Sequence, residues 1–197
     1  FMQDAKPLAG APDAAAKARA KAACERLAAI EARRIVLVDG TFVPELSDLA
    51  GLEAGLAIGS LAQALAAGDV GVVAQLGKVV ACDDAAVALN TAFMGDGAVI
   101  RIGAGVALAR PIQLVFYNSG ARPAAVFTRS IVVVEKGARA MLVESHEGPA
   151  DCDYQVNTAL ELVVGDEAHV DHVKLTGAGA GSVHVATLLA AVGARAR

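Results

Sequence analysis

Apolar residues fall at every second position through much of the second half of the chain, in short runs that end at glycine. Two clear runs are residues 130–135 and 159–164. Gly137, Gly165 and Gly193 close such runs at intervals of 28 residues. A period of two predicts β-strands, and a repeat of this length is typical of strands stacked as a solenoid. We therefore predict repeated strands from about residue 95 onward.

The apolar runs also bear on how these strands are arranged. Residues 131–134 are continuously apolar, which favours strands buried on both faces over the alternating strands of a β-sandwich. No six-residue aliphatic register holds, so a left-handed hexapeptide helix is disfavoured. The sequence thus predicts a mainly β protein, a right-handed parallel β-helix, with the β-sandwich as the alternative.

The first part of the chain begins with a run rich in alanine, lysine and arginine. Pro12 and Asp13 stand where a helix begins, so we predict a helix over residues 13–33. Leu27 and Ile30 give it a narrow apolar face, which indicates light packing on the rest of the protein.

A hairpin and two short helices are expected next. Asp39 and Gly40 lie between two β-prone runs, which predicts a tight hairpin with a primed turn. Pro44 ends the hairpin because proline cannot donate to a ladder, and residues 46–56 form a loop. Each helix begins at a capping side chain and ends near a glycine. The two helices are Ser60 to Ala66, and Asp83 or Asp84 to Met94.

Two domains follow from this change of pattern. Residues 1–94 form a small α+β region, and residues 95–197 form the β-helix core, incomplete at its C-terminal end. Residues 117–123 and 146–153 are rich in Asn, Ser, Gly, Pro and Asp, so we expect loops there.

Composition narrows the class of function. The chain has 197 residues, is 55% hydrophobic and carries a net charge of −4. An acidic chain lacks the basic footprint of a nucleic-acid binder, and 4% aromatic residues offer few stacking platforms for bases or sugars. No apolar run approaches the roughly 20 residues that span a bilayer, and the N-terminus lacks the order of a secretory signal. We expect a cytoplasmic protein that binds neither membrane nor nucleic acid.

The three cysteines show no metal or disulfide pattern. Cys24, Cys82 and Cys152 are odd in number and far apart, so neither a disulfide framework nor a CxxC motif is formed. Asp151 and Asp153 flank Cys152, and acidic neighbours make a reactive thiolate less favourable, so we expect this cysteine to be inert.

The histidines lie in the repeated strands. His169 and His172 are three apart, which places them on opposite faces of a strand and argues against a shared metal. His172 shares a face with Lys174, and Glu144 shares one with His146, which we interpret as the solvated surface of the strands. The pairs Ser145–His146 and Ser182–His184 lack a nucleophile elbow. We therefore predict no catalytic, cofactor-binding or metal-binding residue.

Six segments in order resemble the SufB/SufD family of iron–sulfur cluster assembly proteins. They are LNTAFMGDGAVIRIGAGV followed by PIQLVF, RSIVVVEKGA, NTALELVVGDEA, HVKL and HVATL, and together they extend from about residue 84 to 190. The hairpin at Asp39 and Gly40 is similar to the N-terminal region of the SufD branch. The resemblance carries no functional residue onto His146, His169, His172 or His184, which lie too early in the family pattern.

The resemblance implies a fold and a function. It implies a right-handed parallel β-helix in a non-catalytic scaffold subunit, a SufB-like paralogue and a SufC-like ATPase as partners, and an iron–sulfur cluster that the full complex assembles. We expect no cofactor in this chain. Members of the family are longer, so we expect the last coil, near residues 185–192, to expose apolar side chains and unpaired backbone and to self-associate.

Two other function classes stay open at this point. One is a β-helix enzyme acting on carbohydrate or acyl groups, which the low aromatic content disfavours. The other is a purely structural β-helix that assembles with copies of itself.

Overall fold

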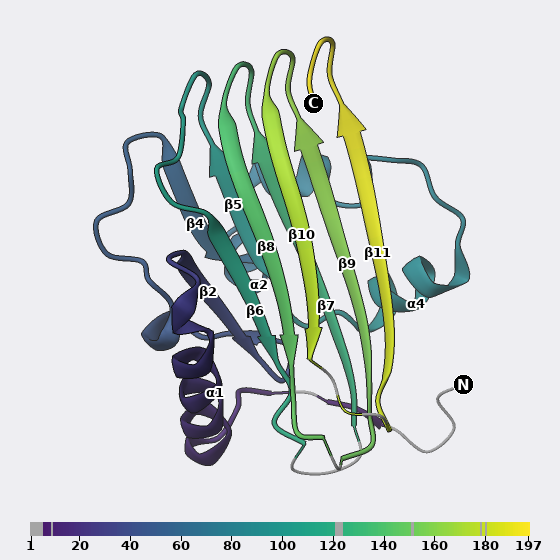
Figure 1. Ribbon diagram of the computed structural model, residues 1–197. Coiled ribbons are helices and arrows are strands. Elements are labelled where there is room, and N and C mark those ends of the chain that lie inside the picture. Colours follow the sequence, from purple (N-terminus) through teal and green to yellow (C-terminus); the bar gives the residue numbers. More distant parts are fainter. Residues whose placement is uncertain (1–5, 9, 121–123, 151, 178, 180) are drawn as a thin grey trace.

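Two β-sheets face each other in the computed structural model, and helices pack on their outer surfaces (Figure 1). The structure describes residues 6–8, 10–120, 124–150, 152–177, 179 and 181–197. Strands that follow one another in the second half of the chain lie in alternate sheets.

The first sheet has the strand order β11–β9–β7–β5–β4. Neighbouring strands are parallel except for β4 and β5, which are antiparallel, and the short β1 is parallel to β7. Its strands are β1 (Lys6–Pro7), β4 (Leu56–Ser60), β5 (Ala98–Ile102), β7 (Ala124–Val134), β9 (Tyr154–Val164) and β11 (Val183–Val192).

The second sheet has the order β10–β8–β6–β2–β3. Its strands are parallel except for the antiparallel pair of β2 and β3. They are β2 (Arg33–Val38), β3 (Thr41–Phe42), β6 (Ile112–Tyr117), β8 (Arg139–Glu147) and β10 (His169–Gly177).

The prediction of a right-handed parallel β-helix is wrong. The chain forms a mixed α/β structure, because both sheets combine parallel and antiparallel pairs and four α-helices lie among the described residues. The continuous apolar runs reflect burial of both strand faces, one against the facing sheet and one under helices or loops. Such burial does not specify a β-helix.

The 28-residue spacing has a different structural meaning. Ala124 pairs with Tyr154, and Gln155 pairs with Val183, so the chain returns to the first sheet after about 30 residues. It visits the second sheet in between. The repeat therefore measures the distance between neighbouring strands of one sheet, and the prediction of repeated strands after residue 95 is confirmed.

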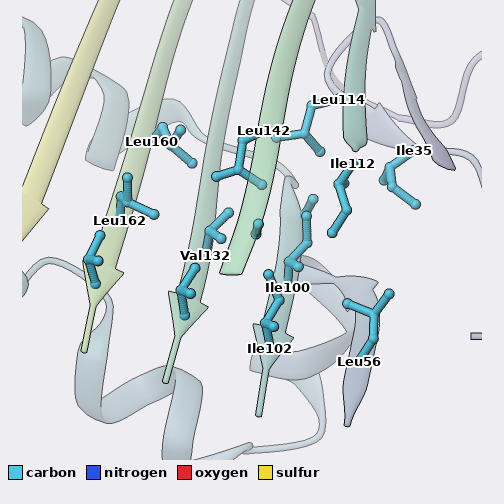
Figure 2. Packing of buried hydrophobic residues seen from close by; sticks show 14 of the residues in the cluster. Ile35, Leu56, Ile100, Ile102, Ile112, Leu114, Val132, Leu142, Leu160 and Leu162 are labelled. Carbon is cyan, nitrogen blue, oxygen red and sulfur yellow. The ribbon is translucent and has the colours of Figure 1, made fainter. Parts of the chain in front are cut away.

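A single large apolar cluster fills the space between the sheets. In Figure 2, Leu160 and Leu162 of β9 lie near Leu142 of β8, and the other labelled side chains continue the layer. Ile35 and Leu56 belong to the same cluster. The core thus combines side chains from before and after residue 94, and the division of the chain there stays a prediction.

The hairpin at Asp39 and Gly40 is confirmed. Val38 pairs with Thr41 in the β2–β3 ladder, and both turn residues have positive φ, 49° and 83°. Positive φ at both central positions defines the primed turn, which glycine adopts without a steric penalty. A 3-10 turn η2 (Pro44–Leu46) follows, so Pro44 ends the hairpin as predicted.

The first helix begins where expected and ends early. In α1 (Ala14–Arg26) the Asp13 side chain accepts a hydrogen bond from the Ala16 N–H, and the 3-10 turn η1 (Leu27–Ala29) follows. The buried face is not the predicted pair Leu27 and Ile30 but a row of alanines: Ala16, Ala20 and Ala23, with Leu27 partly buried beside them. Small side chains let the helix lie close to the outer face of β2 and β6.

The two short helices are confirmed. They are α2 (Leu61–Ala66), capped by Ser60, and α4 (Ala85–Phe93), capped by Asp84. The helix α3 (Val70–Gln75) and the strand β4 are not among the predicted elements. The two predicted loops begin too early, since β6 extends to Tyr117 and β8 to Glu147. Residues 121–123 and 151 of those expected loops lie outside the described residues.

Candidate functional site

Polar side chains lie between the two sheets at the end formed by β10 and β11. On β8, Glu144 and His146 follow Leu142 at a spacing of two, and Leu142 belongs to the core between the sheets. Residues two apart in a strand share a face, so all three point toward the facing sheet. We define the polar cluster as Glu144, His146, Thr158, His172, Lys174 and His184, which come from β8, β9, β10 and β11.

Glu144 is the hub of this cluster. Its Oε1 lies 2.7 Å from Nε2 of His172, and its Oε2 lies 3.2 Å from Nε2 of His146. Glu144 and His146 are 5% and 2% exposed, whereas His172 lies nearer the solvent. A buried carboxylate is therefore held by an imidazole on each oxygen, which is how a charge survives burial.

His146 also connects the two sheets. Its ring stacks on Phe116 of β6, with centroids 4.6 Å apart and planes 3° apart. The ring of His184, on β11 of the other sheet, lies 4.3 Å from it, centroid to centroid. His184 Nε2 in turn lies 3.3 Å from Thr158 Oγ1 on β9. Polar and aromatic contacts thus run from β6 and β8 across to β9 and β11.

Burial and charge shift the protonation of these groups. Burial acts to raise the pKa of Glu144, but the hydrogen bonds from His146 and His172 outweigh it and lower the pKa to about 2. Burial lowers the pKa of His146, and it lowers the pKa of His184 to about 4, with help from His146 and Lys174. Burial also lowers the pKa of Lys174. Glu144 is thus charged at neutral pH, whereas the imidazoles of His146 and His184 are neutral.

The interpretation of Glu144 and His146 as solvated surface is wrong, since both are buried. Core residues and these polar residues follow the same period of two, and continuing the Leu142 face to residue 146 would have found them. His169 and His172 do lie on opposite faces, because the His169 ring is 3.5 Å from Asp171 rather than in the cluster.

The serine–histidine pairs of the sequence do not form sites. Ser145 accepts a hydrogen bond from Gln113 Nε2 on the face opposite His146. Ser182 Oγ donates to the Gly179 carbonyl. The cysteines are free, with Cys82 exposed and Cys24 and Cys152 half-buried, and burial raises the pKa of the Cys24 thiol. Across the part of the chain that the structure describes, no three Cys, His, Asp or Glu side chains are arranged to hold a metal ion.

A second buried polar network lies on the outer face of the first sheet. Arg129 Nε donates to Glu161 Oε1 at 2.6 Å, and Arg129 Nη1 donates to Thr91 Oγ1 of α4. The Gly77 N–H donates to both oxygens of Glu161. Asn90 Nδ2 adds hydrogen bonds to the carbonyls of β7 and β9. This network fastens α4 and the segment after α3 to the sheet, a structural role that the sequence analysis missed.

Comparison with known proteins identifies the family. A family model described as the SufBD protein N-terminal region matches residues 11–114, and one described as the SUF system FeS cluster assembly SufBD core domain matches residues 116–197. The chain therefore belongs to the SufB/SufD family.

A curated relative agrees with this assignment. An iron–sulfur cluster assembly SufBD family protein of Synechocystis is 31% identical over 173 residues, which is 83% of this chain and 38% of the relative. The chain thus spans well under half of that protein. Among the helices that the structure describes, none is long and apolar enough to cross a membrane.

Proposed function

We propose that this chain is part of a SufD-like, non-catalytic scaffold subunit of the SUF iron–sulfur cluster assembly complex. The observation that carries the proposal is the match of the two family regions, in order, from residue 11 to residue 197. In this role its partners are a SufB-like paralogue and a SufC-like ATPase in the cytoplasm, and the cluster is the cargo of the complex rather than a resident cofactor.

The free edges of the two sheets support a docking role. Within the described residues, no strand pairs with the outer edge of β11, and β10 is covered there only where Val170 N–H bonds the Arg197 carbonyl. Leu188 and Val192 of β11 are 48% and 62% exposed. A long edge strand with few charges and no proline is open to pairing with another strand.

The arrangement of side chains supports a non-catalytic role. Ser145 and Ser182 bond to groups other than histidine, and Glu144 already has a hydrogen bond on each oxygen. A general base must reach a substrate proton, and a carboxylate with a pKa of about 2 is a weak base. We assign no catalytic residue to this chain.

Binding to purified SufB-like and SufC-like proteins of the same organism tests the proposal. The chain is titrated into each protein and into their mixture, and binding is followed by calorimetry and native mass spectrometry. We expect a defined complex with the SufB-like protein, and incorporation of SufC through it. Binding to neither protein at concentrations up to about 100 μM, where interfaces of standard size are already populated, would reject the scaffold role.

A further inference from the structure

We propose that the polar cluster is a proton-operated latch, which holds the edge strand β11 against β8 of the facing sheet at neutral pH and releases it in mild acid. The latch consists of His146 on β8 and His184 on β11, whose rings meet across the sheets, and Glu144 on β8, which holds His146. It deepens the scaffold proposal, because it controls the edge at which a partner strand would pair. The latch itself does not depend on the identity of the partner.

The closed state depends on neutral imidazoles that touch across the sheets. The rings of His146 and His184 are 4.3 Å apart, centroid to centroid, and Phe116 stacks on the other side of His146. Two neutral rings pack well at that separation. Two imidazolium ions there would repel each other in a site with little water to screen them.

The surroundings of His146 offer no acceptor for a second ring N–H. Its Nε2 faces Glu144 and is the donor to that carboxylate, so Nδ1 carries no hydrogen in the neutral ring. Nδ1 is buried and has no hydrogen-bond partner among the described atoms. Protonation would create a buried N–H donor without an acceptor, which adds the cost of an unmade hydrogen bond to that of the charge.

The charged groups around the two rings do not offset the cost of protonating them. Glu144 on β8 supports a positive charge on both His146 and His184, but it is already bonded to His172. Lys174 on β10 opposes a positive charge on both His146 and His184. Phe116 of β6 and Thr158 of β9 complete the surroundings and carry no charge. A proton that binds His146 or His184 therefore adds a positive charge near Lys174, and the nearby carboxylate of Glu144 is already hydrogen-bonded.

The direction of the pH effect follows from linkage. His184 has a pKa of about 4 in the closed state and an ordinary value of 6.5 once exposed, so the open state binds more protons between these values. The closed state is favoured above pH 6.5 and loses that advantage as the pH falls toward 4. For one histidine with these values, the open population rises about 20-fold between pH 7 and pH 5. His146 shifts in the same direction and adds to the effect.

Hydrogen exchange of the backbone amides is the test. Exchange of residues 169–177 and 183–192 is measured between pH 7.5 and pH 5 and corrected for the intrinsic pH dependence. We expect local opening of β11 to rise about 20-fold between pH 7 and pH 5, while β5 and β7, farther from this edge, stay protected. The variant His184→Leu, with an uncharged side chain, should remain closed and lose most of this response.

A histidine outside the latch provides the matched control. His169 lies on β10 but points away from the cluster toward Asp171. His169→Leu should therefore keep the full response. An unchanged exchange pattern in the parent chain, or a response retained in His184→Leu, would overturn the proposal.

Imidazole resonances give a readout that does not need a variant. If His184→Leu fails to fold, NMR titration of the parent chain decides the matter. His184 should remain neutral down to about pH 4, and His146 should also titrate below its ordinary range. Titration of both rings near 6.5 would reject the latch. Failure of partner binding would leave these results unchanged, so the two proposals can fail separately.

Discussion

Arg129 and Glu161 form an ion pair on adjacent strands of the first sheet, with 2.6 Å between Nε and Oε1 and with side chains 3% and 0% exposed. The pair lies under α4 and the segment after α3, and the Gly77 N–H completes the hydrogen bonds of the carboxylate. A buried pair contributes little net stability as a whole, but removal of one partner leaves the other charged and unpaired.

Glu161→Ala should therefore destabilise the fold by about 3–5 kcal/mol. The free energy of unfolding is measured by urea titration. The control is Glu135→Ala, which removes the same side chain from an exposed pair with Arg101 and should cost about 1 kcal/mol or less. Equal losses in the two variants would show that Arg129 finds another partner or reaches water.

Asp96 holds three segments together through hydrogen bonds, and its replacement should be similarly destabilising. Its Oδ2 accepts the Phe42 N–H of β3, and its Oδ1 accepts the Ser60 hydroxyl and the Ala62 and Gly97 N–H groups. Asp96→Ala leaves several buried donors without an acceptor, each of which costs about 1–3 kcal/mol. We expect a loss of at least about 3 kcal/mol in the same unfolding assay.

Asp84→Ala is the matched control for that loss. Asp84 caps α4 from an exposed position, so its removal should cost only about 1 kcal/mol. A loss at Asp96 no larger than that at Asp84 would contradict the assignment of Asp96 as a structural hub.

Gly97 lies so close to β7 that it cannot carry a side chain. A Cβ placed there would lie 1.7 Å from the Arg129 carbonyl oxygen, which is backbone and cannot rotate away. Gly97→Ala should therefore cost more than about 3 kcal/mol or prevent folding. Gly59→Ala, in β4 of the same sheet, meets no atom within 4 Å and should be tolerated. Thermal unfolding of the two variants measures the difference, and similar midpoints would contradict it.

The pH dependence of stability should contain a contribution from Glu144. Its pKa falls from an ordinary 4.5 to about 2 on folding, so the stabilisation is complete above pH 4.5 and is lost as the pH falls toward 2. The two values correspond to about 3 kcal/mol. Urea unfolding at pH 6, 4 and 3 should show a steeper acid loss in the parent chain than in Glu144→Gln. Parallel curves would mean that the carboxylate is not charged in the fold.

Local sequence features predicted local structure well. The Asp39–Gly40 turn and the caps at Ser60 and Asp84 each depend on contacts within a few residues, and each is confirmed. The period of two also identified the strands of the second half. These signals are encoded in adjacent residues, so no knowledge of the rest of the chain was needed.

The arrangement of the strands depends on contacts that the sequence does not mark. β4 pairs antiparallel with β5 although residues 61–97, with three helices, separate them. Choice of partner at that distance is set by packing of the whole core, not by local pattern.

The same limit applies to the polar cluster. Glu144 and His184 come from strands of different sheets, and the charge of Glu144 predicts a surface position although the residue is buried. The burial of Glu144 and its bond to His172 depend on the pairing of β10 with β8, which the sequence alone does not reveal.

Self-association through the edge of β11 is the last prediction. The Gly193 N–H bonds β9, and N–H groups alternate in direction along a strand, so the N–H of Ala190 points away from β9. Ala190→Pro removes a donor at the free edge without breaking the ladder, whereas Ala190→Ser keeps it. Light scattering over a tenfold concentration range should show association of the parent chain and of Ala190→Ser, and a weaker association of Ala190→Pro. A monomeric parent chain, or equal association of all three, would show that β11 is not the pairing edge.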